Sequence, residues 1–288
     1  MKIILSRKGF DSANGGVPSP IFPDGRLLSL PIPASSSPTR FADCRWTGGD
    51  VGTLVEGLTA GRISALSPTH LDPDLDAGSL PRQSDWRPAF GQTGTAQAHL
   101  DQHGIGVGDL FLFFGWFREV ESTAEGTWRF KRNVPDLHVL FGWLQVGTVL
   151  RVADRVQSYR QRYPWLRNHP HLHGTWSAAN TIYVAAEKMD FFGAECFSRQ
   201  AGAGTFPVVS EARTLTAPHQ PLRSSWRLPS WFHPANGDLS LSYHGRAERW
   251  SAAFDGSTRL NAVARGQEFV LMTNRWQEVG DWLAKIFS

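Results

Sequence analysis

The sequence predicts an α+β fold that is rich in short strands and long loops, and three stretches carry that prediction. Residues 108–115 form a continuous apolar run bounded by glycines, with the length and aromatic content typical of a strand buried on both faces. A second aromatic run at residues 137–146 provides a hairpin partner for it. Residues 275–286 predict a closing helix whose apolar residues share one face, and these are Trp276, Val279, Leu283 and Ile286.

Weaker signals place the other elements of the first half. The run Ile3-Ile4-Leu5 predicts a short buried strand. The hairpin signal Asp24-Gly25 precedes a second strand at residues 27–33. A helix is expected at residues 95–103, since Thr95 can cap it and a glycine can end it. Between these elements, residues 34–90 are rich in turn-forming residues, which is typical of a functional surface laid over a scaffold.

The second half continues with short elements and no repeats. Residues 154–163 predict a basic amphipathic helix with Val156 and Tyr159 turned inward. Further strands are expected at residues 180–185, near Ser240 and at residues 268–272. Helices and short strands in this mixture define the α+β class.

The composition is that of a globular protein with a sizeable core. The chain has 288 residues, of which 41% are hydrophobic and 19% charged. No apolar run approaches the roughly 18 residues that a membrane helix needs, and the run at the N-terminus is too short for a signal peptide. We therefore expect a cytoplasmic protein without membrane contact. With only Cys44 and Cys196, a disulfide framework and a cysteine-based zinc site are disfavoured.

Charge and aromatic content mildly favour a polyanionic partner. The formal net charge is +3, and arginine outnumbers lysine. Arginine binds phosphates and stacks on bases, although a preference for arginine codons would give the same excess. The 12 tryptophans and 18 phenylalanines serve mainly in cores, yet such rings also form stacking platforms for bases.

Several phrases along the chain occur together in a known order. They are Ile4-Leu5-Ser6-Arg7-Lys8-Gly9-Phe10-Asp11, Pro18-Ser19-Pro20-Ile21, Leu30-Pro31-Ile32-Pro33, His70-Leu71-Asp72-Pro73-Asp74-Leu75, residues 108–117 and residues 265–270. Over essentially its whole length the chain resembles the nucleotide modification associated domain 3 family. The resemblance implies a bacterial or phage protein linked to hypermodification of DNA bases. It brings no catalytic assignment with it.

A looser likeness concerns the middle of the chain. A Gly-Asp pair followed by an aromatic strand, and then the strand Phe141-Gly142-Trp143-Leu144, is similar to the barrel of the PUA and EVE group, which binds modified bases. This is an analogy of fold alone. We therefore expect one domain over residues 1–288, with a barrel-like core at about residues 104–188.

The first candidate site lies where the first strand ends. Arg7 and Lys8 can neutralise phosphate, with Ser6 beside them, and Asp11 can act as a general base or hold a ribose hydroxyl. The following Gly15-Gly16 turn exposes backbone N–H groups that can hold an anion. The alternative is an Asx turn at Asp11 flanked by solvated basic residues.

The second candidate site is the segment His70-Leu71-Asp72-Pro73-Asp74. In an extended chain, alternate spacing directs His70, Asp72 and Asp74 to one side. That arrangement suits an acid/base pair or a hard divalent cation. The alternative is ordinary turn chemistry, for which Asp-Pro-Asp is common.

The third candidate is the triplet His169, His171 and His173. Three alternate imidazoles on a strand could bind zinc, but Pro170 favours a loop in which one histidine is buried and the others are exposed. We therefore assign no metal ligands from the sequence, and we leave the cofactor open.

The fourth candidate site combines Gln267 and Glu268 with Trp231 upstream. A glutamine amide can bind a base edge with two hydrogen bonds, and a glutamate can accept one from an exocyclic amine. An extruded base also needs an aromatic wall. The alternative is that Glu268 is a surface carboxylate and Trp231 belongs to the core.

These features favour an enzyme that alters or removes a DNA base, by group transfer or by cleavage of a glycosidic bond. The expected partners are DNA with modified bases and a small-molecule co-substrate. Two alternatives stay open, a non-catalytic reader of modified bases and a metal-dependent nuclease that uses His70, Asp72 and Asp74. Serine hydrolases, zincins and nicotinamide enzymes are disfavoured because their motifs are missing.

Overall fold

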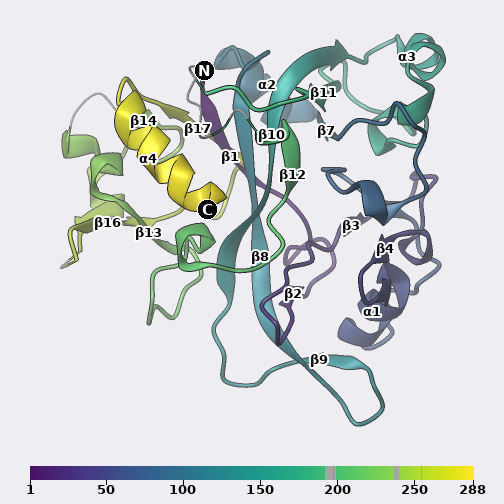
Figure 1. The fold of residues 1–288 in the computed structure, drawn as a ribbon, viewed down its shortest axis with the longest axis horizontal. Helices are drawn as coiled ribbons and strands as arrows, with labels where there is room; N and C mark the ends of the chain where they lie inside the picture. The colour runs from purple at the N-terminus through teal and green to yellow at the C-terminus, as the bar shows by residue number, and fades with distance from the viewer. Residues whose placement is uncertain (192–196, 198, 237–239, 254) are drawn as a thin grey trace.

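A ten-stranded mixed sheet organises the molecule (Figure 1), seen in a computed structural model that describes residues 1–191, 197, 199–236, 240–253 and 255–288. Its strands run in the order β14-β17-β1-β8-β10-β11-β7, with β2 and β9 paired to β8 and β12 paired to β10. Their bounds are β1 Ile3–Arg7, β2 Ser19–Ile21, β7 Ala89–Gln92, β8 Leu110–Ser122, β9 Trp128–Phe130, β10 Leu137–Arg151, β11 Thr181–Ala185, β12 Ala203–Thr205, β14 Ser240–Leu241 and β17 Glu268–Met272.

Three smaller sheets and four α-helices surround this sheet in the described part of the chain. The small sheets are β13-β16-β15, β3-β6 and β4-β5. Their strands are β3 Ile32–Pro33, β4 Arg45–Trp46, β5 Gly49–Asp50, β6 Thr69–His70, β13 Ser225–Pro229, β15 Trp250–Ala252 and β16 Ser257–Asn261. The helices are α1 Val51–Leu58, α2 Gly94–Gln102, α3 Val156–Arg162 and α4 Trp276–Phe287. None of these helices is long and apolar enough to cross a bilayer. The predicted α+β class is confirmed.

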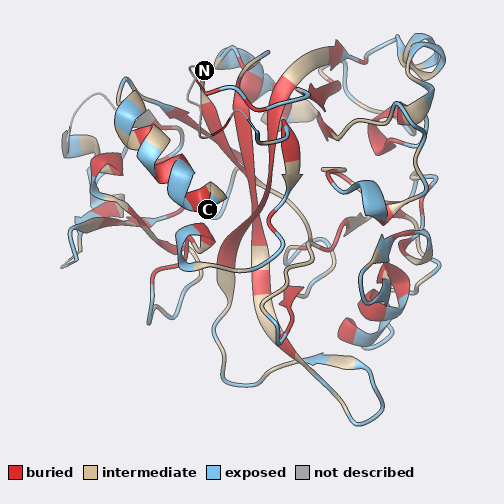
Figure 2. Cartoon of the chain, in the orientation of Figure 1, coloured by how far each residue is buried: buried red, intermediate tan, exposed pale blue. Residues whose placement is uncertain are grey.

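The central strand β8 is buried on both faces, as its apolar run predicted. Leu112 and Phe114 point into one core, where α4 contributes Val279, Leu283 and Ile286. Phe111 and Phe113 point into the opposite core together with Phe90 of β7 and Leu100 of α2. Figure 2 shows the buried residues running through the middle of the sheet. The expected partner is also correct, since β8 pairs antiparallel with β10.

The sheet curls strongly but stays open among the described residues. Strand β7 stands five places from β17 in the strand order, yet Gln92 at the end of β7 donates a hydrogen bond to Glu268 at the start of β17, at 2.6 Å. Side chains therefore bridge the open edge, and none of the described sheets closes into a barrel. This curl brings the ends of β1, β7 and β17 to one place.

Two local predictions differ from the structure. The strand expected at residues 27–33 is reduced to β3, because Pro31 and Pro33 lack the N–H groups that a ladder needs. Helix α3 is shorter than predicted, although Val156 and Tyr159 pack inward as expected. Cys44 is buried and free. Cys196 lies outside the described residues.

Candidate functional site

A polar pocket of about 840 Å³ lies where β1 and β7 end and β17 begins. Lys8, Gln92 and Glu268 line one wall. Another wall is lined by His70 at the end of β6, by Asp72 just after it and by His171 in a 3-10 turn, all outside the large sheet. Ligand pockets typically measure about 300–1,000 Å³, so this cavity is large enough for a nucleotide.

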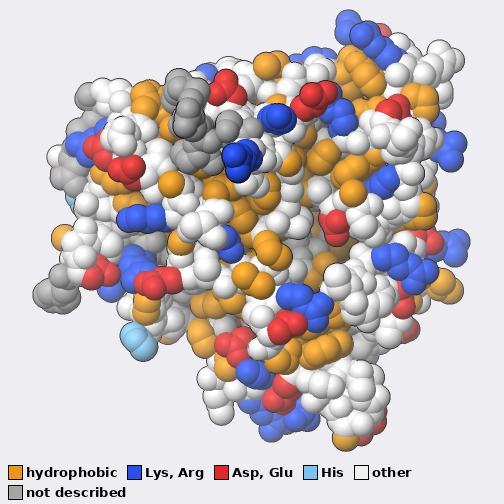
Figure 3. All heavy atoms as spheres, in the orientation of Figure 1, with side chains coloured by type: hydrophobic (Ala, Val, Ile, Leu, Met, Phe, Trp, Pro, Cys, Tyr) orange, Lys and Arg blue, Asp and Glu red, His pale blue; other side chains and the backbone are white. Residues whose placement is uncertain are grey.

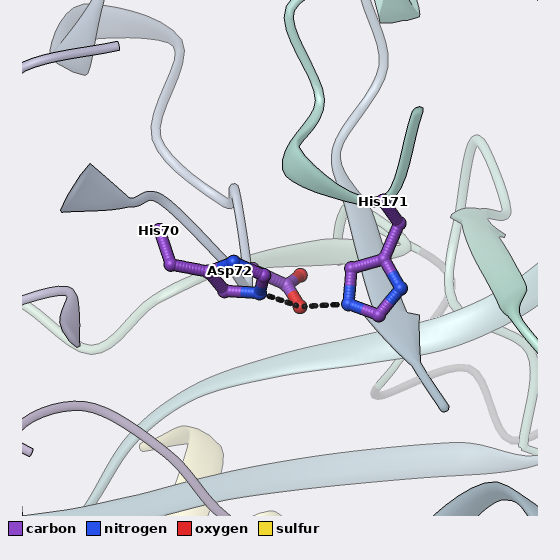
Figure 4. A group of neighbouring side chains, drawn as sticks. All are labelled: His70, Asp72 and His171. Atoms are coloured by element: carbon purple, nitrogen blue, oxygen red, sulfur yellow. Dashed lines mark ion pairs between the residues drawn. The ribbon is translucent and has the colours of Figure 1, made fainter. Parts of the chain in front are cut away.

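Two imidazoles converge on one oxygen of Asp72 (Figure 4). Nε2 of His70 lies 3.4 Å from Asp72 Oδ2, and Nε2 of His171 lies 3.5 Å from the same oxygen. Only 4% of the Asp72 side chain and 3% of the His171 side chain are exposed, against 13% for His70. We call His70, Asp72 and His171 the His-Asp-His centre. Its three side chains are close enough to hold one metal ion between them.

The surroundings fix each group of this centre. The N–H of Gly91 donates to Asp72 Oδ1 at 2.8 Å. Asn180 anchors the far side of the His171 ring, with its Oδ1 2.5 Å from Nδ1 and its Nδ2 donating to the His171 carbonyl at 2.8 Å. The ring also stacks on Trp176, with centroids 4.5 Å apart and planes 3° apart. A Cβ on Gly91 would lie 2.3 Å from the ring, so the close approach requires glycine here.

Asp72 is an anion in this setting. Burial alone would raise the pKa of its carboxyl group, but the facing rings of His171 and His70 hold the pKa well below its usual value. A third imidazole stands behind the carboxylate, with His169 Nε2 3.7 Å from Asp72 Oδ1. Burial lowers the pKa of His169 to about 3, so this ring is neutral near pH 7.

The opposite wall centres on a buried ion pair. Lys8 Nζ lies 2.8 Å from Glu268 Oε1, with 10% and 0% of the two side chains exposed. The ammonium also lies over the Phe90 ring, 4.6 Å from its centroid. Gln92 Nε2 donates to the same Glu268 oxygen and lies 3.4 Å from Gln267 Oε1. Glu268 Oε2 has no hydrogen-bond partner within the described ranges. This wall thus combines amide, ammonium and carboxylate groups.

The structure brings most of the predicted site residues to this pocket. Arg7, Lys8 and Asp11 line it, together with His70 and Asp72 and with Gln267 and Glu268. The reason is the register of the strands, because β1 pairs with β17 and places Ser6 opposite Glu268. The Ser6 side chain is fully buried beneath the wall.

Two residues on the rim have local partners. The Arg7 guanidinium donates to the carbonyl oxygens of Ala264 and Val263 at 2.7 and 2.9 Å. Oδ1 of Asp11 accepts from the N–H groups of Ala13 and Asn14 at 2.8 and 2.6 Å, which is the geometry of an Asx turn.

Asp74 and Trp231 lie elsewhere. The backbone of Asp74 pairs with Ala89, and its carboxylate forms a two-pronged ion pair with Arg82, with N–O distances of 2.8 and 2.5 Å. The alternate spacing therefore directs His70 and Asp72 to the same side, as predicted, but it does not bring Asp74 there. Burial raises the pKa of Asp74 to about 6, against the opposing charge of Arg82. Trp231 stacks on Phe232 within the core that α4 covers.

The site also contains residues that were not predicted as part of it. The sequence pattern groups His171 with His169 and His173, whereas the structure separates the three. His173 bonds to the Arg167 carbonyl and to Arg160, while His171 turns towards Asp72. Gln92 carried no signal in the sequence. The sequence predicted one buried histidine in this triplet, whereas His169 and His171 are both buried.

The fold and the site together define an α+β protein with a nucleotide-sized polar pocket at the open edge of its sheet. The model of the nucleotide modification associated domain 3 family matches residues 2–272 of the 288. The chain therefore belongs to this family, which links it to nucleotide modification. No curated protein and no solved structure is significantly similar to it.

Proposed function

We propose that this protein is an enzyme that alters or removes a base in DNA, and that the pocket of about 840 Å³ is its active site. One observation carries the proposal: a cavity of nucleotide size places the His-Asp-His centre opposite a wall built from Lys8, Glu268 and glutamine side chains. Membership of a nucleotide modification family supports the same class of substrate.

The wall suits the recognition of a base. Glutamine amides offer a donor and an acceptor that match a base edge, and Glu268 can accept from an exocyclic amine. Trp176 and Tyr243 also line the pocket and supply aromatic faces on which an extruded base can stack. Arg7 on the rim adds positive charge for the backbone of the substrate, whereas the charge of Lys8 is balanced by Glu268.

The His-Asp-His centre suits general acid–base catalysis. A buried carboxylate and two imidazoles at one point can accept a proton from an attacking group and return one to a leaving group. Group transfer to a base and cleavage of a glycosidic bond both require this chemistry. In this proposal Asp72 and His70 are catalytic residues, and Asp74 and Trp231 take no part.

A basic segment precedes His171 of the centre in the sequence. Arg155, Arg162 and Arg167 precede His171 in the chain, are exposed, and form no ion pair within the described residues. Figure 3 shows basic side chains at the corner of the molecule that α3 occupies. Exposed arginines without an acidic partner suit the phosphates of a polyanion, which supports DNA as the partner.

The test is to incubate the purified protein with unmodified and hypermodified DNA and to analyse the digested nucleosides by mass spectrometry, with an assay for abasic sites. The proposal predicts a lost or shifted nucleoside with wild-type protein. It predicts an unchanged profile with D72N, although that variant still binds the DNA. The matched control is D24N, because Asp24 is an exposed carboxylate paired with Arg26.

Three results would overturn the proposal. Tight binding to one modified DNA with no chemical change would indicate a reader. Chelator-sensitive strand scission without prior loss of a base would indicate a nuclease. Unchanged and unbound DNA, in the presence of candidate small-molecule donors, would remove DNA as the substrate.

A further inference from the structure

The orientation of His171 leaves a problem of charge inside the His-Asp-His centre. Asn180 donates through Nδ2 to the His171 carbonyl, and therefore presents its Oδ1 to the ring. An amide oxygen only accepts, so Nδ1 of His171 carries the hydrogen. In a neutral ring, Nε2 then turns a lone pair towards the carboxylate of Asp72. Two acceptors that face each other require a cation between or beside them.

The distances distinguish a proton from a metal ion. Charge-assisted N–H···O bonds measure about 2.7–2.9 Å, but the two Nε2 atoms lie 3.4 and 3.5 Å from Asp72 Oδ2. Around a tetrahedral ion with bonds of about 2.0–2.2 Å, neighbouring ligand atoms lie roughly 3.3–3.6 Å apart. The two spacings to Asp72 Oδ2 therefore match edges of a coordination tetrahedron, and the three ligand atoms all lie within 4.8 Å of one another.

We propose that His70, Asp72 and His171 bind a divalent first-row transition-metal ion, with a further coordination position open to the pocket. Two imidazoles and one carboxylate favour zinc or iron over magnesium and calcium, which prefer oxygen ligands. Three protein ligands with an open position are typical of catalytic rather than structural metal sites. As a catalytic ion it would replace the direct acid–base role of His70 and Asp72 and rests on the proposed function, whereas as a binding site it does not.

The groups behind the ligands match those of a metal site. Metal-bound histidines usually hydrogen-bond through their second nitrogen, which fixes the ring, and Asn180 has this role for His171. Metal-bound carboxylates are also hydrogen-bonded, and Gly91 donates to the Asp72 oxygen that the two ligand rings do not face. His169 is 5% exposed and its Nε2 has no hydrogen-bond partner among the described residues. It lies behind Asp72 and is not a ligand.

The experiment uses full-length protein without a histidine tag, stripped of metal with a chelator and then titrated with Zn²⁺ in a calorimeter. The proposal predicts one high-affinity site per chain. H171Q and H70Q should weaken binding by about 100-fold or more, while N180A, which removes an outer partner, should cost roughly 10–100-fold. H173Q is the matched control and should bind as wild type, since His173 lies outside the centre. Binding of Co²⁺ should give the visible absorption of a tetrahedral site.

The proposal is overturned if the protein binds neither zinc nor cobalt stoichiometrically. It is also overturned if H171Q, folded as wild type by circular dichroism, binds zinc with unchanged affinity. The two proposals fail separately. If stripped protein still processes DNA in the presence of chelator, the catalytic ion is wrong and acid–base catalysis stands. If zinc binds as predicted but no DNA changes, the site stands and the proposed substrate is wrong.

Discussion

Two groups of histidines, one in the core and one at the pocket, differ in how their ring nitrogens are used. In the core beside α4, His244 donates through Nδ1 to the Ser242 carbonyl and accepts through Nε2 from the Val263 N–H, at 2.8 and 3.1 Å. His138 accepts from the Trp226 indole at 2.9 Å. In the pocket, by contrast, His70 and His171 both face an anionic carboxylate at distances too long for good hydrogen bonds.

The difference separates a structural role from a functional one. Both nitrogens of the His244 ring are hydrogen-bonded, and Nδ1 of His138 has the Trp226 indole as its donor. Burial lowers the pKa of both rings, that of His138 well below its usual value and that of His244 to about 4. The His-Asp-His centre is incomplete without a further ligand or a proton in transit. Polar groups that are held in place yet unsatisfied at a cavity are candidates for chemistry.

The largest expected effect is on D72N, which should lose activity in the pocket without losing the fold. The asparagine oxygen can still accept from the Gly91 N–H, but the negative charge that the two imidazoles face is gone. We expect the rate in the nucleoside assay to fall by about 10²–10⁴-fold, with a circular dichroism spectrum that matches wild type. A D72N rate within a few-fold of wild type would show that the His-Asp-His centre has a structural role and not a catalytic one.

The corresponding test of the core concerns pH and stability. Because burial, helped by the charges of Arg249 and Arg7, lowers the folded-state pKa of His244 to about 4, the unfolded chain takes up the proton more readily as the pH falls. The stabilisation that neutral His244 gives to the folded state is fully present above about pH 6.5 and is lost as the pH approaches 4. The loss amounts to up to about 3 kcal/mol.

Urea unfolding between pH 7 and 4.5 measures this loss directly. H244Q should be less stable than wild type at pH 7, yet its free energy of unfolding should decline less steeply with acid. Equal slopes for the two proteins would show that His244 is not responsible for acid sensitivity.

A smaller effect is expected from G91A, which changes no chemical group of the centre. The new Cβ would lie 2.3 Å from the His171 ring and must displace it. Affinity for zinc and activity should both fall by about 10-fold or more. G106A is the control, because a Cβ there meets no atom within 4 Å. Identical behaviour of the two variants would mean that the position of His171 is unimportant.

The smallest effect should come from the basic segment before the centre. The double charge reversal R162E/R167E removes exposed positive charge without touching the pocket. We expect a several-fold loss of DNA affinity that shrinks as salt is raised, with zinc binding unchanged. R129E, on the distant β9 hairpin, should have little effect. If R129E lowers DNA affinity as much as the double variant does, the effect comes from overall charge and not from this segment.

The fold was predictable where local pattern determines it. The glycine-bounded aromatic run of β8 and its partner β10 were visible in the sequence, because burial on both faces demands continuous apolar residues. The face of α4 was visible for the same reason. The curl of the sheet was not, since it depends on contacts such as Gln92 with Glu268, 176 residues apart.

The candidate site was predictable in pieces. The ends of β1 and β17 and the His70–Asp72 segment were each recognised by residue type. Their meeting in one pocket depends on pairing and curl that no single segment encodes. Asp74 shows that alternate spacing alone does not determine which side chains meet, because an ion pair with Arg82 directs the Asp74 carboxylate away from the pocket. Trp231 shows that an aromatic ring in a sequence does not by itself distinguish a core residue from a stacking platform.

The most direct test of the account is nucleoside mass spectrometry of one modified DNA after incubation with wild-type protein, D72N or H244Q at pH 7.5. If the pocket is the reaction centre, wild type and H244Q convert the same nucleoside at similar rates per folded molecule, and D72N does not. If D72N converts it as fast as wild type, or if H244Q is the variant that fails, the assignment of structure and function to the two groups of histidines is wrong.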